Sequence, residues 1–243
     1  MDRKKIDLLQ VLYRHAGDFH GTGWACKKGC SACCTQSVTM TTLEGREIVS
    51  FLKKIGASKV CESISKAAGE IDIPKMTTNR FASLCIEEDE SQDIEEEGSW
   101  NFSSCMFLKD GSCSIYEVRP FSCRCLLSRT PCSEQGYAVM DPVTITLNTV
   151  FQQLIEHIDQ GGYWGNMVHV VGSLLMDTDP DCQQEEEQCF SKLLPCSPLP
   201  GFVITPEEQL EVKRVVDRLF SSSIGGGTFN EAMQEVVAGN RYQ

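Results

Sequence analysis

The chain has 243 residues, a length typical of one domain or of one domain with an appendage. Hydrophobic residues make up 41% of the sequence and charged residues 23%, which excludes a disordered or collagen-like chain because enough apolar surface is present to form a core. A formal charge of −12 without a basic block argues against nucleic acids and anionic membranes as partners.

Whether the cysteines form disulfides or bind metal depends on the compartment in which the chain resides. We find no apolar run of signal-peptide length at the amino terminus and no stretch near the roughly 18 apolar residues of a membrane span. A cytoplasmic protein is therefore expected. Cytoplasmic thiols are kept reduced, so the fourteen cysteines indicate metal binding or redox chemistry rather than disulfides.

The first third of the chain predicts three helices. Apolar residues recur at helical spacing over residues 6–16, and this helix is expected to stop at Gly17. Thr41 and Glu44 have the spacing of a capping box, which predicts the start of a second helix. Residues 58–71 predict a third helix.

The middle of the chain predicts a solvated loop and a hairpin. Residues 87–97 contain eight carboxylates in eleven positions, and such a block repels itself. Residues 100–108 read as a short strand that ends in the turn signal Lys109-Asp110-Gly111.

Helices return in the last hundred residues. We expect a helix over residues 143–159, its continuation over 164–176 after a glycine break, and a loop over 177–200. Thr205 with Pro206 predicts the start of a helix, and a last short helix covers residues 229–237. The fold class is thus mainly α with a few short strands, with helices around a cysteine-rich metal-binding centre. A metal-binding domain is expected over 1–140 and a helical region packed on it over 141–243.

Two groups of cysteines carry the functional prediction. The first places four cysteines within nine residues of a glycine- and lysine-containing loop: Cys26, Cys30, Cys33 and Cys34. A short loop can wrap its thiolates around a soft metal without closing a long chain segment. The second group comprises Cys105, Cys113, Cys123, Cys125 and Cys132.

Basic and aromatic side chains accompany the second group. Four thiolates around a zinc ion or a 2+ iron–sulfur core leave a charge of about −2, which Arg119 and Arg124 could offset from beside the ligands. Tyr116 either lies beside the metal ligands, like these arginines, or is an ordinary buried tyrosine.

The pattern of both groups resembles a known family. Cys26-x3-Cys30-x2-Cys33-Cys34, a Glu44-containing helix and Cys113-Ser-Ile-Tyr116-Glu-x-Arg119-Pro120-x-x-Cys123 are similar to the cysteine-cluster family of zinc- or iron-chelating domains, which includes relatives of flagellin lysine N-methylase. The resemblance covers residues 20–132. It implies a metal site with the ligands Cys26, Cys30, Cys33, Cys34, Cys105, Cys113, Cys123 and Cys132.

The remaining cysteines and the histidines are assigned no ligand role. Cys61 and Cys85 are interpreted as buried thiols. The roles of Cys125, Cys182, Cys189 and Cys196 stay open. Among the histidines, only His20 lies near the first group along the chain.

Three functions remain open. The first is a metal-binding protein that holds an iron–sulfur cluster or zinc, and the adjacent Cys33-Cys34 pair favours a polynuclear cluster or two metals. The second is a lysine N-methylase-like or other S-adenosylmethionine-dependent enzyme, because Cys26-x3-Cys30-x2-Cys33 is also the radical S-adenosylmethionine spacing. The third is a metal-stabilised interaction module, for which the acidic block favours a basic protein partner.

Overall fold

The fold was analysed in a computed structural model that describes residues 3–56, 60–68, 71, 73–87, 102–177 and 191–240. It is mainly α-helical with short antiparallel strands, as the sequence predicts. The acidic block from residue 88 onward, Cys182 and Cys189 lie outside the described residues. Within the described residues no helix is both long and apolar enough to cross a membrane.

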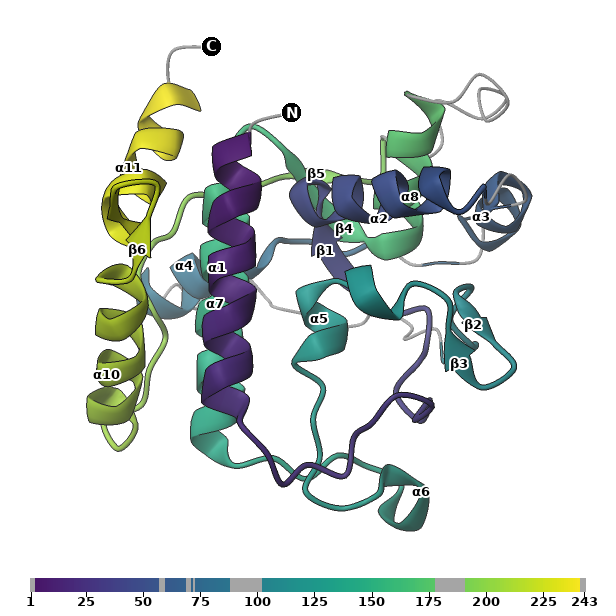
Figure 1. The fold of residues 1–243 in the computed structure, drawn as a ribbon, viewed down its shortest axis with the longest axis horizontal. Helices are drawn as coiled ribbons and strands as arrows, with labels where there is room; N and C mark the ends of the chain where they lie inside the picture. The colour runs from purple at the N-terminus through teal and green to yellow at the C-terminus, as the bar shows by residue number, and fades with distance from the viewer. Residues whose placement is uncertain are drawn as a thin grey trace.

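The helices and strands follow one another in a mixed order (Figure 1). In the first half they are α1 (Arg3–His20), β1 (Thr39–Thr41), α2 (Thr42–Lys54), α3 (Val60–Ala68), α4 (Thr78–Glu87), β2 (Leu108–Lys109), β3 (Ser112–Cys113), the short 3-10 helix η1 (Tyr116–Val118), α5 (Phe121–Arg124) and α6 (Cys132–Gln135). In the second half they are α7 (Pro142–Ile158), β4 (Tyr163–Asn166), α8 (Met167–Met176), β5 (Leu194–Pro195), α10 (Gln209–Phe220), β6 (Ser223–Ile224), β7 (Gly227–Thr228) and α11 (Phe229–Asn240).

One hydrophobic core lies between α1, α7, α10 and α11. Figure 1 shows α1 and α7 lying together, with α10 and α11 along one side. The amphipathic spacing of α1 buries Leu8, Leu9 and Leu12 in this core. The helix α1 continues past Gly17 to His20, so the predicted end at Gly17 is wrong. The helix ends where Gly21, at φ +59°, donates its N–H to Gly17 O (3.0 Å).

A second core lies between α2, α3, α8 and a small sheet. The sheet has the order β1-β4-β5 with antiparallel pairs, and Met40 of β1 lies opposite Gly165 of β4. The predicted capping box at the start of α2 is confirmed: Thr41 Oγ1 accepts from Glu44 N, and the Glu44 carboxylate accepts from Thr41 N. Because β1 precedes residue 140 and β4 and β5 follow it, the sheet joins the two parts of the chain.

Several predicted boundaries differ from the structure. Residues 164–176 form β4 followed by α8 rather than one helix, because β4 pairs on both sides with β1 and β5. Residues 102–107 are not a strand, whereas the turn after them does form the predicted hairpin, β2–β3. The helix α10 begins at Gln209, four residues after Thr205, whose hydroxyl instead donates to Glu208 Oε2 (3.1 Å).

Candidate metal centre

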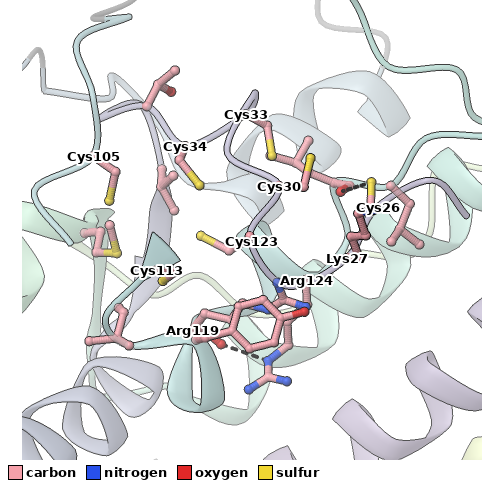
Figure 2. A pocket seen from close by; sticks show the side chains of 18 residues that line it. Cys26, Lys27, Cys30, Cys33, Cys34, Cys105, Cys113, Arg119, Cys123 and Arg124 are labelled. Atoms are coloured by element: carbon pink, nitrogen blue, oxygen red, sulfur yellow. Dashed lines mark hydrogen bonds between the residues drawn. The ribbon is translucent and has the colours of Figure 1, made fainter. Parts of the chain in front are cut away.

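Seven cysteines from the two sequence groups line one pocket (Figure 2). They are Cys26, Cys30, Cys33, Cys34, Cys105, Cys113 and Cys123. Val38, Ile115 and Met167 line the same pocket and belong to the second core. The cavity measures about 110 Å³. Its lining brings together cysteines from segments nearly a hundred residues apart.

The first group is presented by a loop of tight turns between α1 and β1. Cys30 N donates to Lys27 O (2.9 Å), and Cys34 N donates to Ser31 O (3.0 Å). Gly29 makes the first turn at φ +92°, in the left-handed region that other residues rarely adopt. These turns point successive cysteines toward the same pocket.

The second group is presented by the β2–β3 hairpin. Leu108 pairs with Cys113 across the hairpin, and Leu108 N donates to Cys105 O (2.9 Å). The turn residues Asp110 and Gly111 both have positive φ, as a type I′ hairpin turn requires. Cys105 N donates to Cys34 O (2.9 Å), which connects the two groups directly.

Cys123 is carried by the short helix α5, which Glu44 holds in place. The buried Glu44 carboxylate accepts hydrogen bonds through Oε1 from Phe121 N (2.7 Å) and from the Tyr13 hydroxyl (2.7 Å). Ser122 Oγ also donates to Thr39 O (2.6 Å). The sequence predicted Glu44 as a helix cap but did not predict its hydrogen bonds to α1 and α5. Contacts between segments that are distant along the chain produce no recognisable spacing in the sequence.

The two predicted arginines lie at the pocket in different settings. Arg119 stacks on the Tyr116 ring at 4.0 Å, and its buried Nε has no hydrogen-bond partner among the described residues. Arg124 donates to Arg119 O (2.8 Å) and Glu117 O (2.7 Å) and stacks on Tyr13. Arg119 thus has an unused donor at a pocket of thiols, whereas Arg124 already binds two backbone carbonyls.

Lysines at the pocket were missed by the sequence reasoning. Lys27 lines the pocket, and Lys28 Nζ lies 5.7 Å from the centre of the Tyr116 ring, which Arg119 also stacks on. Their position in the sequence between Cys26 and Cys30 could have indicated that both lysines lie near the thiols. Their charges add to those of the arginines beside the thiols.

Burial and mutual proximity raise the pKa of several pocket thiols. The pKa of Cys123 is raised well above its usual value, first by burial and then by Cys105 and Cys113. The pKa of Cys34 is raised by burial and then by the same two neighbours. Burial, followed by Cys34, raises the pKa of Cys33 to about 11. A metal that binds here must displace these protons.

The other expected site residues lie outside the pocket lining. Cys132 is the first residue of α6 and is near enough to contribute to a raised pKa at Cys26. Cys125 is buried, its thiol pKa is raised to about 12 by desolvation, and it points to Ser122 O (3.5 Å). His20 Nε2 lies 2.8 Å from Asn148 Oδ1.

Two of the remaining cysteines correct an expectation. Cys61 is half-buried and disulfide-bonded, and Cys85 is exposed, so the prediction that both are buried free thiols is wrong. Cys61 lies on α3 and Cys85 on α4, and neither lines the pocket.

The arrangement of sulfurs bears on what kind of metal could fit. Among the described residues, no three histidine, cysteine, aspartate or glutamate side chains form a group that could hold a metal ion. The thiols instead surround a cavity of about 110 Å³, whereas a single water molecule needs only ~10–15 Å³. Soft thiol donors are ligands of zinc and of iron–sulfur clusters alike, so the donor set fits either group.

Comparisons of the chain with family models, with curated proteins and with solved structures found no match. The resemblance to cysteine-cluster chelating domains therefore remains an expectation from the sequence motifs. The function must be argued from the pocket itself.

Proposed function

We propose that the seven-cysteine pocket holds a metal centre through cysteine thiolates, and that this centre is an iron–sulfur cluster rather than a single zinc ion. The observation that carries the proposal is the convergence of seven thiols from two distant stretches on one cavity. Free thiols in an ordinary core are dispersed among apolar side chains. Here they surround a common space.

The size of the cavity favours a cluster over an ion. A polynuclear cluster spaces its thiolate ligands further apart than a single ion does, because each iron binds a different sulfur. That spacing agrees with thiols that line a cavity without forming a single-ion site. Zinc is the other occupant the sequence allows, and it takes four thiolates around one ion.

The surrounding residues suit an electron-rich centre. The buried Val38, Ile115 and Met167 provide an apolar wall that limits water. The Arg119 guanidinium places positive charge beside Cys26 and Cys34 and lowers their pKa, against the larger effect of burial. When bound, an iron–sulfur cluster supplies one-electron transfer. The chain's own residues hold the ligands, exclude water and balance their charge.

A reducing compartment, such as the cytoplasm, follows from this proposal. Only reduced thiols bind metal, and eleven of the described cysteines are free. Cys61 is the described exception, and it lies on α3, away from the pocket lining.

The proposal is tested by purifying the chain without oxygen and measuring iron, zinc and acid-labile sulfide together with the visible spectrum. We expect iron and sulfide in comparable amounts and a brown protein. Cys85→Ser is the matched control, because this exposed thiol is outside the pocket. A folded protein that contains neither metal, or zinc without iron and sulfide, would refute the proposal.

A further inference from the structure

We propose that only four of the seven pocket cysteines are ligands of the metal centre: Cys34, Cys105, Cys113 and Cys123, the inner thiols. Cys26, Cys30 and Cys33, the outer thiols, then remain free at the mouth of the pocket. This inference rests on the proposed function and specifies its ligand set. It runs against the sequence spacing, in which Cys26-x3-Cys30-x2-Cys33 alone suggests a cluster-binding triplet.

The directions of the side chains separate the two sets. In Figure 2 the sulfurs of the inner thiols turn toward a common space, whereas those of the outer thiols follow one another along the loop on the other side of the pocket. The Cys26 sulfur lies 3.8 Å from Leu126 O, on the side of the pocket away from the inner thiols.

Backbone contacts hold the inner thiols together. The hydrogen bond from Cys105 N to Cys34 O joins the loop to the residue before the hairpin. Cys105 and Cys113 then lie at the two ends of the segment closed by the β2–β3 pairing. Cys123 is fixed on α5 through the bond from Phe121 N to Glu44. The inner set is therefore prearranged from three separate segments.

Burial agrees with this division for five of the seven thiols, while Cys26 and Cys34 are both half-buried. Cys105, Cys113 and Cys123 pack against the second core, whereas Cys30 and Cys33 are exposed residues. Ligands set against apolar side chains shield a cluster from water and oxygen. Cys30 and Cys33 lie where solvent reaches them.

The number of ligands and their charge also fit four rather than seven. A [4Fe–4S] cluster takes four cysteine thiolates, one at each iron. Four thiolates on a 2+ core leave a charge of about −2, whereas seven would leave about −5 in a partly buried site. Arg119, whose charge acts on Cys34 and Cys26, lines the pocket with Lys27 and Arg124, and these three positive charges offset −2 more fully than −5.

Thiol protection tests the assignment without relying on any activity. The metal-loaded chain is treated with iodoacetamide in the absence of oxygen, and the modified cysteines are identified by peptide mass spectrometry. We expect Cys26, Cys30 and Cys33 to be alkylated together with the exposed Cys85, and the inner thiols to be protected. Protection of the outer thiols, with or without protection of the inner ones, would overturn the assignment.

Single variants provide a second readout. Cys113→Ser and Cys34→Ser should lose the iron, sulfide and visible absorbance, whereas Cys30→Ser and Cys33→Ser should keep them at the level of Cys85→Ser. Circular dichroism of each variant shows whether it has folded, and the outer variants decide the question even if an inner variant does not fold. Loss of the cluster from Cys30→Ser overturns the assignment but leaves the proposed function intact. A wild-type chain without metal removes both.

Discussion

Arg119 is the residue whose setting most clearly points to a ligand in the pocket. Its Nε is buried without a hydrogen-bond partner among the described residues, an arrangement that costs free energy unless an acceptor binds there. Stacking on Tyr116 fixes the plane of the guanidinium. In the proposed metal centre, a sulfur would be that acceptor.

Replacing Arg119 should therefore weaken the metal centre more than it weakens the fold. We expect Arg119→Lys to lower metal retention against a chelator by about 10–100-fold, because lysine cannot reproduce the fixed planar donor. The control is Arg129→Lys, which also removes an arginine stacked on an aromatic ring, Trp24, but outside the pocket lining. If both variants retain metal as well as the wild type does, Arg119 has no role at the centre.

Metal retention should also depend on pH. Burial and the neighbouring thiols raise the pKa of Cys34, Cys105 and Cys123, so each ligand releases a proton when metal binds. Retention is then expected to strengthen as the pH rises through the neutral range, because fewer protons compete. Chelator competition at a series of pH values measures this trend, and retention that is independent of pH would contradict thiol ligation.

At the scale of elements, the β2–β3 turn sets the distance between Cys105 and Cys113. Gly111 has φ +73° with no atom near its missing Cβ, so a side chain there is strained by the backbone alone. We expect Gly111→Val to cost about 1–2 kcal/mol of unfolding free energy and to lower metal retention. Gly136→Val is the matched control: Gly136 has φ +79° and the same open space but lies at the end of α6. It should cost similar stability and leave metal retention unchanged.

Glu44 joins three helices, α1, α2 and α5, through one buried carboxylate. Burial raises its pKa above the usual 4.5. The folded state therefore holds this proton more tightly than the unfolded state does, and the resulting stability is present below pH 4.5 and is lost as the pH rises through the raised pKa.

Glu44→Gln removes this titration. The free energy of unfolding of the wild type, relative to that of Glu44→Gln, should fall as the pH rises above 4.5. Denaturant unfolding of both proteins across this pH range measures the difference. A difference that rises with pH would show that the hydrogen bonds to the carboxylate outweigh its burial.

The elements that the sequence predicted well are those with a local signal. The spacing of apolar residues in α1 and α7, the Thr41–Glu44 cap and the Asp110-Gly111 turn are each formed by neighbouring residues. The strand β4 was missed because its pairing partners, β1 and β5, are distant in sequence. The same limit applies to Glu44, whose contacts with Tyr13 and Phe121 no spacing reveals.

At the scale of the whole molecule, the pocket depends on both parts of the chain. Asp159 at the end of α7 accepts hydrogen bonds from Thr42 Oγ1 (2.7 Å) and Leu43 N (2.8 Å), which anchors the start of α2. Met167 of α8 lines the pocket itself. The motifs predicted that the two cysteine groups meet, and the structure brings seven of these cysteines together. The choice among the seven could not be predicted, because it depends on burial and side-chain direction rather than on spacing.

A polynuclear metal centre in this pocket, as proposed, adds a defined mass to the chain. Native mass spectrometry of the anaerobically purified chain tests it most directly, because one spectrum reports the mass of the folded chain with whatever it has bound. We expect a mass that exceeds that of the 27.0 kDa chain by the mass of an iron–sulfur cluster. A folded chain at its bare mass, or one carrying a single zinc ion, would contradict it.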